Sequence, residues 1–203
     1  MGLFDSAQVK KEKIINGLLN SGDNHDMVAS FTTLQNEIGV KFNTKVVAIT
    51  SIKDDELAAA FAKGFANAFA TNGSTSLIID GNLYNPCLRK MLNASTDNNE
   101  EQKMIDIDEK TKVLCLNKEI YPSEAYKNGV IQKIIEENKD QFDHFIILVP
   151  AIKEHKEIVL LNDVLESVIL VTQKNVTIKE HIFNAVQYCS NNNLPLAKAV
   201  VLK

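Results

Sequence analysis

Short apolar segments that alternate with amphipathic helical segments constrain the fold of this chain more than any other feature. Continuous apolar runs are typical of strands buried on both faces of a parallel sheet. The predicted strands are 46–50, 76–80, 112–116, 142–149, 167–173 and 197–203. Helices between successive strands imply βαβ units with right-handed crossovers. We therefore predict an α/β fold with a doubly wound, mainly parallel sheet flanked by helices.

Apolar residues at helical spacing indicate where the helices lie between these strands. The predicted helices are 27–38, 57–73, 88–92, 129–141, 158–166 and 178–193. One face of helix 57–73 is apolar, which we interpret as core packing. That face consists of Leu57, Phe61, Phe65 and Phe69. The polar segment 93–103 is expected to be an exposed loop.

A length of 203 residues suits one α/β domain with a substantial core. We treat 1–203 as a single domain with residues 1–26 as an N-terminal arm. Within that arm, residues 7–20 have weak helical periodicity and form either a peripheral helix or a mobile segment. Doubly wound sheets bind ligands outside the carboxyl ends of their strands. The loops at those ends are 50–56, 80–86, 116–121, 148–153 and 172–176.

Charge and composition narrow the range of partners. The net charge of −4 gives no overall positive field, so we expect no nucleic-acid partner. No apolar run approaches the roughly 20 residues that span a bilayer. Cys87, Cys115 and Cys189 lack metal-binding spacing and are interpreted as reduced thiols. We expect a cytoplasmic protein.

Six stretches resemble a known family. They are ASFTTLQNEI (29–38), VVAITS (46–51), LIIDGNLYNPCLRKML (77–92), FDHFIILVPA (142–151), SVILVTQKNVT (167–177) and LPLAKAVVLK (194–203). In this order they are similar to the bacterial tyrosine kinases of capsule and exopolysaccharide synthesis. Those kinases belong to the deviant-Walker P-loop group, together with the MinD and ParA ATPases. The resemblance implies a P-loop NTPase-like fold.

The phosphate-binding loop of that family has the form Pro-Gly-Glu-Gly-Lys-Ser-Thr. In the register that the resemblance gives, Asp55 and Leu57 replace its glycines, and Ala58 replaces its lysine. Ala59 stands where the magnesium-binding hydroxyl is expected, and only Glu56 is unchanged. A phosphate loop needs glycines, a lysine and a hydroxyl. We therefore interpret the loop as degenerate.

The acids of this loop, Asp54, Asp55 and Glu56, oppose a bound triphosphate. Two like charges 4 Å apart repel by about 4 kcal/mol at an effective dielectric of 20. Acids do suit the positive end of a helix dipole, and Asp54 or Asp55 is a candidate helix cap. We expect these carboxylates to stabilise the protein at the position that a phosphate would fill.

The other nucleotide motifs are altered in parallel. The aspartate pair of the Walker A′ motif corresponds to Asp80 and Asn82, and the Walker B aspartate corresponds to Leu148. The family's ring-forming helix motif, Glu-x-x-Arg-x-x-Arg, falls on uncharged residues. These are Ala29, Thr32 and Gln35. We expect ATP and Mg²⁺ to be lost as cofactors, with weak nucleotide binding left open.

The resulting hypothesis is a non-catalytic pseudokinase or pseudo-ATPase that regulates capsular or exopolysaccharide biosynthesis. The resemblance implies one of two partners: a membrane protein that controls polysaccharide chain length, or an active kinase paralogue. Such a partner would hold the protein at the inner face of the membrane. A homodimer through the nucleotide face is a further expectation, because related ATPases pair there.

Two alternatives remain open. In the first, the chain is an enzyme with relocated chemistry or residual tyrosine kinase activity, since acids crowd the strand ends. Those acids are Asp54, Asp55, Glu56, Asp80 and Glu154. In the second, a remodelled pocket binds a small ligand through Asn82, Tyr84 and Asn85.

Overall fold

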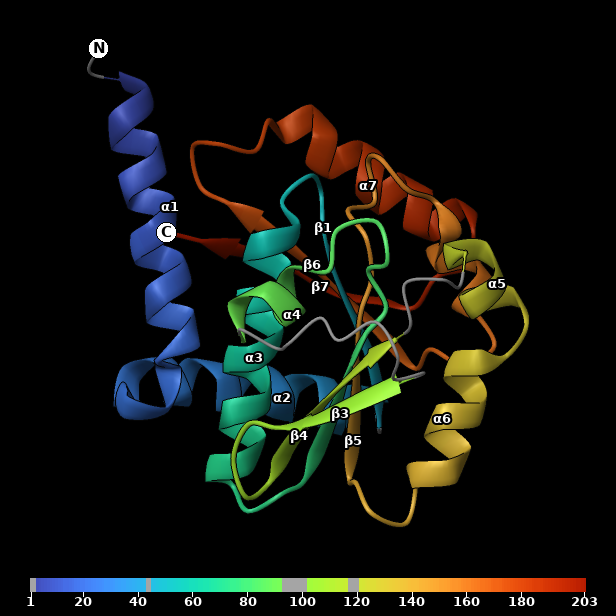
Figure 1. Ribbon diagram of the computed structural model, residues 1–203. Helices are drawn as coiled ribbons and strands as arrows, with labels where there is room; N and C mark the ends of the chain where they lie inside the picture. The colour runs from blue at the N-terminus through green and yellow to red at the C-terminus, as the bar shows by residue number, and fades with distance from the viewer. Residues whose placement is uncertain (1–2, 43–44, 93–101, 117–120) are drawn as a thin grey trace.

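The computed structural model describes residues 3–42, 45–92, 102–116 and 121–203, and its centre is a seven-stranded sheet (Figure 1). The strand order is β3-β4-β2-β5-β1-β6-β7. The strands are β1 (Val46–Ser51), β2 (Ser76–Asp80), β3 (Gln102–Asp106), β4 (Thr111–Leu116), β5 (His144–Leu148), β6 (Ser167–Gln173) and β7 (Leu196–Leu202). All neighbouring strands are parallel except β3 and β4, so the predicted mainly parallel sheet is confirmed.

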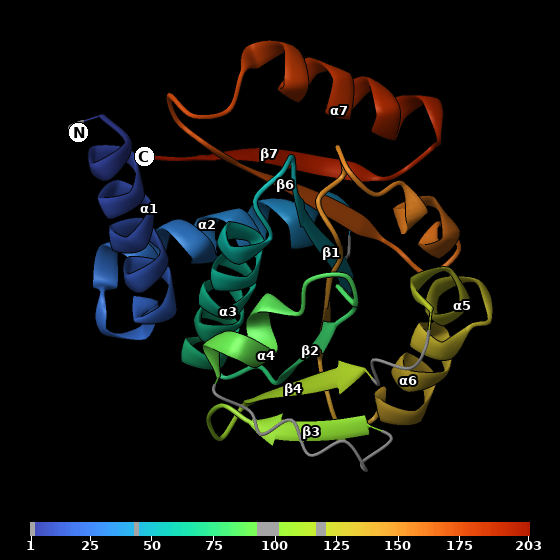
Figure 2. The same cartoon turned by 45° about the horizontal axis from the view of Figure 1, so that its top comes forward.

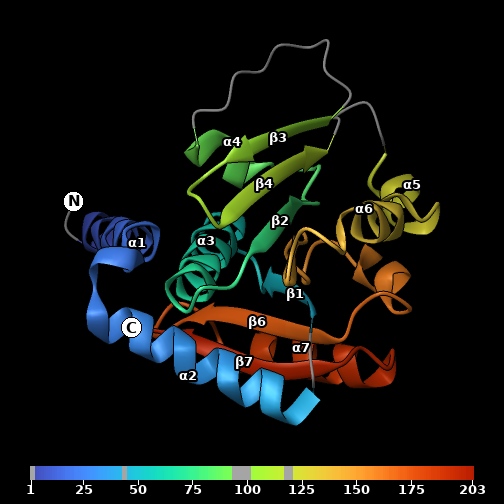
Figure 3. The same ribbon diagram turned by 90° about the horizontal axis from the view of Figure 1, so that it is seen from below.

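Helices cover both faces of this sheet, as the doubly wound prediction requires. One face carries α1 (Leu3–Leu19), α2 (His25–Phe42), α3 (Asp55–Thr71) and α4 (Cys87–Met91). The other carries α5 (Pro122–Lys127), α6 (Val130–Asn138) and α7 (Lys179–Asn191). Figures 2 and 3 show the two layers on either side of the strands. Because β1, β2 and β6 are enclosed by both layers, every residue in them is buried.

The apolar face of α3 forms the core of the first layer, as predicted. Phe61 stacks on Phe65 with ring centroids 6.1 Å apart, and Phe31 of α2 meets Phe61 edge-on at 5.1 Å. Gly64 makes this contact possible, because a Cβ there would lie 2.9 Å from the Phe31 ring. The glycine therefore sets how closely α2 approaches α3.

Several segments differ from the sequence-based prediction, and one of them is α5 (Pro122–Lys127), where no helix was expected. Residues 102 and 103, expected to lie in a loop, begin strand β3, which pairs antiparallel with β4. β3 lies at the edge of the sheet, where side chains reach solvent and Met104 is 40% exposed. Its sequence is therefore partly polar and does not show the continuous apolar run by which the other strands were predicted. The prediction of a helix over 158–166 is wrong. A shorter 3₁₀ helix (η2) covers Glu157–Leu161, and the polar Asn162 and Asp163 lie in the turn that follows it.

The N-terminal residues form helix α1, which lies alongside α3 (Figures 1 and 3). Leu18 is buried against the first layer, and the Lys63 ammonium of α3 donates to the carbonyl of Leu19. A second short 3₁₀ helix (η1, Ser21–Asp23) connects α1 to α2. Among the described residues, none of the helices has the length and apolar character needed to cross a membrane.

Candidate functional site

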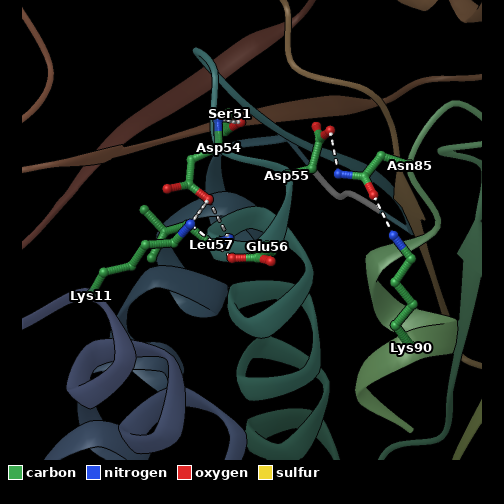
Figure 4. Close-up of polar contacts among 8 residues, drawn as sticks. All are labelled: Lys11, Ser51, Asp54, Asp55, Glu56, Leu57, Asn85 and Lys90. Carbon is green, nitrogen blue, oxygen red and sulfur yellow. Dashed lines mark hydrogen bonds and ion pairs between the residues drawn. The ribbon is translucent and has the colours of Figure 1, made fainter. Parts of the chain in front are cut away.

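The candidate site begins where β1 turns into α3, at the position of the degenerate phosphate loop. Asp54 is the N-cap of α3, since its carboxylate accepts the Leu57 N–H at 3.1 Å. The Asp54 N–H donates to Ser51 Oγ at 2.8 Å, which fixes the turn (Figure 4). The predicted helix cap is therefore confirmed, with Asp54 in that role.

A lysine from a distant part of the chain lies over the same turn. Lys11 Nζ of α1 is 3.0 Å from Asp54 Oδ1 and 2.8 Å from Glu56 Oε2 (Figure 4). Partial burial alone would lower the pKa of Lys11, but the hydrogen bonds and charges of Glu56 and Asp54 outweigh it and raise that pKa. The ammonium group thus stays charged and offsets two of the acids. Sequence reasoning missed Lys11, because only the fold brings α1 to this turn.

Asp55 connects three loops at the carboxyl ends of the strands. Its Oδ1 accepts the Ala151 N–H after β5 at 2.9 Å. Its Oδ2 accepts from Asn85 Nδ2, after β2, at 3.4 Å (Figure 4). Asn85 Oδ1 in turn accepts from Lys90 Nζ at 2.8 Å. The carboxylate therefore occupies backbone and side-chain donors that an external anion would otherwise use.

A nucleotide with Mg²⁺ is what the fold family implies here, and the residues present do not fit it. Leu57, Ala58 and Ala59 are buried in the core, so the family's lysine and hydroxyl positions present no polar side chain. The Leu57 N–H already donates to Asp54. Among the described residues, no group of three or more His, Cys, Asp or Glu side chains is arranged to hold a metal ion.

The end of β2 holds two buried polar side chains, Asp80 and Asn82, which are 2% and 1% exposed. Asp80 Oδ2 accepts the Arg89 N–H at 3.3 Å, whereas Oδ1 has no partner among the described residues. Burial raises the pKa of Asp80 to about 7. Asn82 Oδ1 accepts the Asn85 N–H at 3.0 Å, and its Nδ2 is likewise without a described partner.

Leu148, at the Walker B position, is fully buried in β5. Its carbonyl accepts the Gly81 N–H at 3.0 Å, and a Cβ at Gly81 would lie only 3.0 Å from that oxygen. The strand end is therefore closed by backbone contact. No carboxylate reaches into the site from this position.

The remaining candidates lie in the turn after β5 or face it. The Tyr84 ring stacks on His155 with centroids 3.8 Å apart, and its hydroxyl donates to Glu157. This hydrogen bond is the main reason why the pKa of Tyr84 rises to about 12. Glu154 is exposed in the same turn. Tyr84 therefore packs against the turn after β5 rather than joining the acids of α3.

The positions of the family's ring motif make contacts within the chain. Gln35 is 7% exposed, and its Nε2 donates to the Phe65 carbonyl at 2.6 Å. Thr32 Oγ1 accepts from Asn72 Nδ2 at 3.2 Å. Two of the three positions thus attach α2 to α3.

No protein-family model and no curated protein sequence matches this chain. Solved structures do match it. The VpsO kinase domain has a TM-score of 0.73 at 16% identity, with 99% of each chain covered. The kinase domain of Escherichia coli tyrosine kinase ETK has a TM-score of 0.69 at 14% identity, covering 86% of this chain and 74% of that one.

A ParA-family ATPase from Chlorobium tepidum also matches, with a TM-score of 0.53 at 14% identity, over 78% of this chain and 72% of that one. The chain therefore resembles bacterial tyrosine kinase domains and ParA-like ATPases in its fold. The predicted P-loop NTPase-like architecture is confirmed. At these identities the match concerns the fold alone.

Proposed function

We propose that this chain is a non-catalytic pseudokinase that serves as a regulatory or adaptor protein in capsular or exopolysaccharide production. One observation carries the proposal. The helix start that would receive a phosphate is occupied by the chain's own charges. Asp54 caps α3, Asp55 accepts the Ala151 N–H, and Lys11 pairs with Asp54 and Glu56.

Electrostatics supports the same conclusion. Phosphoryl transfer depends on positioned cations around the phosphates. Here three carboxylates and one ammonium group lie at the helix start, so the local charge disfavours a triphosphate. A nucleotide would first have to displace the Asp54 and Asp55 hydrogen bonds. An intact α/β framework around such a site suits recognition of a protein partner better than catalysis.

The partner that we propose is either a membrane protein that sets polysaccharide chain length or an active kinase paralogue. This follows from the resemblance to kinases of polysaccharide synthesis. Binding to the membrane protein would place the chain at the inner face of the membrane. A homodimer through the carboxyl ends of the strands is a further form that the proposal includes.

Nucleotide binding is the decisive experiment. Purified protein is titrated with ATP and ADP, with and without Mg²⁺, by calorimetry and thermal shift, beside an active kinase domain of this fold. A true one-site ligand stabilises the folded state by about 2.7 kcal/mol at a hundredfold excess over Kd. We expect no stabilisation at millimolar nucleotide. Saturable Mg²⁺-dependent binding would refute the proposal.

Recovery of partners tests the regulatory role separately. The protein is captured from its native cells with mild detergent, and the proteins bound to it are identified. Lys11→Glu, which reverses the charge over the α3 turn, serves as a comparison variant. We expect a polysaccharide chain-length protein or a kinase among the specific partners. Their absence would leave a pseudokinase without a role in this process.

A second candidate function has its own observation. Asp80 Oδ1 and Asn82 Nδ2 are buried without described partners, and burial raises the pKa of Asp80 to about 7. Buried unpaired groups and a carboxyl that titrates near neutrality are features of binding and acid–base sites. A remodelled site for a small polar ligand, a weakly bound nucleotide included, is the alternative. Nucleotide titrations together with ATPase and tyrosine kinase assays on wild type and Asp80→Asn distinguish it, because only a working site loses binding or activity on substitution.

A further inference from the structure

A cavity of about 460 Å³ lies away from the start of α3, between the helices of the first layer and the end of β7. It is lined by α1, α2 and α3 as well as by the last residues of β7. The lining residues are Leu18, Asn24, Asp26, Met27, Ser30, Phe31, Leu34, Phe61, Val200 and Leu202. The Asp54 turn and the end of β2 contribute nothing to it.

The walls of this cavity are held in place by specific contacts. The back wall is the edge-on pair of Phe31 and Phe61. Helix α2 is attached to the rest of the fold by the buried hydrogen bond from Gln35 to the Phe65 carbonyl. An ion pair of 2.6 Å between Glu37 and Lys198 attaches the same helix to β7. The cavity is therefore preformed, as ligand sites usually are.

The lining is apolar except for three residues at one end. There, Asn24 Oδ1 accepts the Met27 N–H at 3.2 Å, and Ser30 Oγ donates to the Asp26 carbonyl at 2.9 Å. Among the described residues of the lining, Asp26 is the one that carries a charge. It makes no ion pair with any residue that the structure describes. It is exposed in the first turn of α2, so the described part of the lining includes one carboxylate without a cationic side chain beside it.

We propose that this cavity binds a small amphiphile with an apolar body and a cationic head group. Ligand pockets are lined mainly by apolar side chains with a few polar groups, as this one is. The apolar body would lie against Phe31, Phe61 and Leu34, and the head group would face Asp26. At the roughly 30 Å³ that one water occupies, the cavity has room for about 15 non-hydrogen atoms. Charge complementarity with Asp26 selects a cation over an anion.

Displacement of a neutral fluorescent probe that is smaller than the cavity, 1-aminonaphthalene, tests the proposal on the full chain. Decylammonium, decanol and decanoate compete with the probe, all below their micelle concentrations. We expect decylammonium to compete at a concentration roughly two- to fivefold lower than decanol, the range for an exposed charge pair. Decanoate should be the weakest competitor. In the Asp26→Asn variant, the concentrations at which the three competitors displace the probe should become similar, whereas the probe should bind as it does to the wild type.

Filling the cavity tests its location. Leu34→Trp, at a half-buried position of α2, should weaken probe binding by roughly tenfold, because the indole would fill space that the probe needs. Val200→Trp fills the same space from β7 and serves if the first variant folds poorly by circular dichroism. Leu160→Trp is the matched control, since it adds an indole at a partly exposed leucine outside the cavity.

Three results would overturn the proposal. The first is probe binding that survives both filling variants. The second is equal competition by decanoate and decylammonium. The third is self-association in sedimentation experiments that Leu34→Trp abolishes, because the cavity would then receive a second copy of the chain. None of these results bears on nucleotide binding, so this inference and the proposed function can fail independently.

Discussion

Asp80→Asn offers the sharpest test of the buried carboxyl at the end of β2. Burial raises the pKa of Asp80 from 3.8 to about 7, so the folded state holds its proton while the unfolded state loses it. Between these two values the folded state binds more protons, and stability falls as pH rises. The stabilising contribution of the bound proton is fully present below about pH 4 and is lost by about pH 7, and at 1.36 kcal/mol per pH unit this loss approaches about 4 kcal/mol.

Asparagine keeps an acceptor for the Arg89 N–H and removes the charge. The free energy of unfolding of the variant, relative to that of the wild type, should therefore increase with pH, by up to about 4 kcal/mol between pH 4 and pH 8. Urea denaturation followed by circular dichroism at several pH values measures the difference. Taking the difference between the two proteins removes the contributions of other titrating groups, which both proteins share. One such group is His144, whose pKa is lowered by burial and whose contribution to stability therefore increases with pH.

Asp163→Asn, which changes an exposed carboxylate in the turn after η2, is the matched control. It should leave the pH dependence of the wild type unchanged. A difference between Asp80→Asn and the wild type that stays flat from pH 4 to 8 would refute the reasoning. It would mean that Oδ1 is solvated or that the carboxylate has a counter-charge.

Three further substitutions test other contacts. Lys11→Met should lower the free energy of unfolding by at most about 1 kcal/mol, because its ion pairs are partly exposed. The difference from the wild type should shrink in high salt, and a difference that does not depend on salt would contradict the pairing. Asp54→Ala should cost about 1–2 kcal/mol in urea denaturation and Asp54→Asn clearly less, since only asparagine keeps the cap; equal losses would argue against capping. Gly64→Ala should lower the melting temperature, because the clash of the new methyl group with Phe31 costs about 1–3 kcal/mol. That cost exceeds the ~1 kcal/mol by which alanine is favoured over glycine in a helix. A stabilised variant would show that Phe31 moves aside freely.

Periodicity predicted most of the fold because the buried strands are apolar throughout. The segments at 46–50, 76–80 and 167–173 match β1, β2 and β6 closely. β3 was missed because an edge strand needs few apolar residues, and its pairing with β4 is visible only in the sheet. The error over 158–166 has a local cause. Apolar spacing alone does not show that the helical segment ends at Leu161 and that Asn162 and Asp163 lie in a turn.

The candidate site was predicted only in part. Local sequence was enough for the Asp54 cap, because a cap involves residues three apart. Lys11 pairs with Asp54, 43 positions away, and Asp55 accepts from Ala151, 96 positions away. Nothing in the local sequence indicates these partners. The unpartnered Oδ1 of Asp80 could not be foreseen either, since burial on both sides comes from tertiary packing.

The hydrogen bond from Ala151 to Asp55 has a consequence for motion. The Ala151 amide donates to the side chain of the first residue of α3, not to a backbone carbonyl of a neighbouring strand. Its exchange with deuterium therefore requires the loops after β1 and β5 to separate, and its rate reports how often they do so. Because the Asp55 carboxylate also accepts from Asn85, we expect the loops after β1, β2 and β5 to open together rather than one at a time.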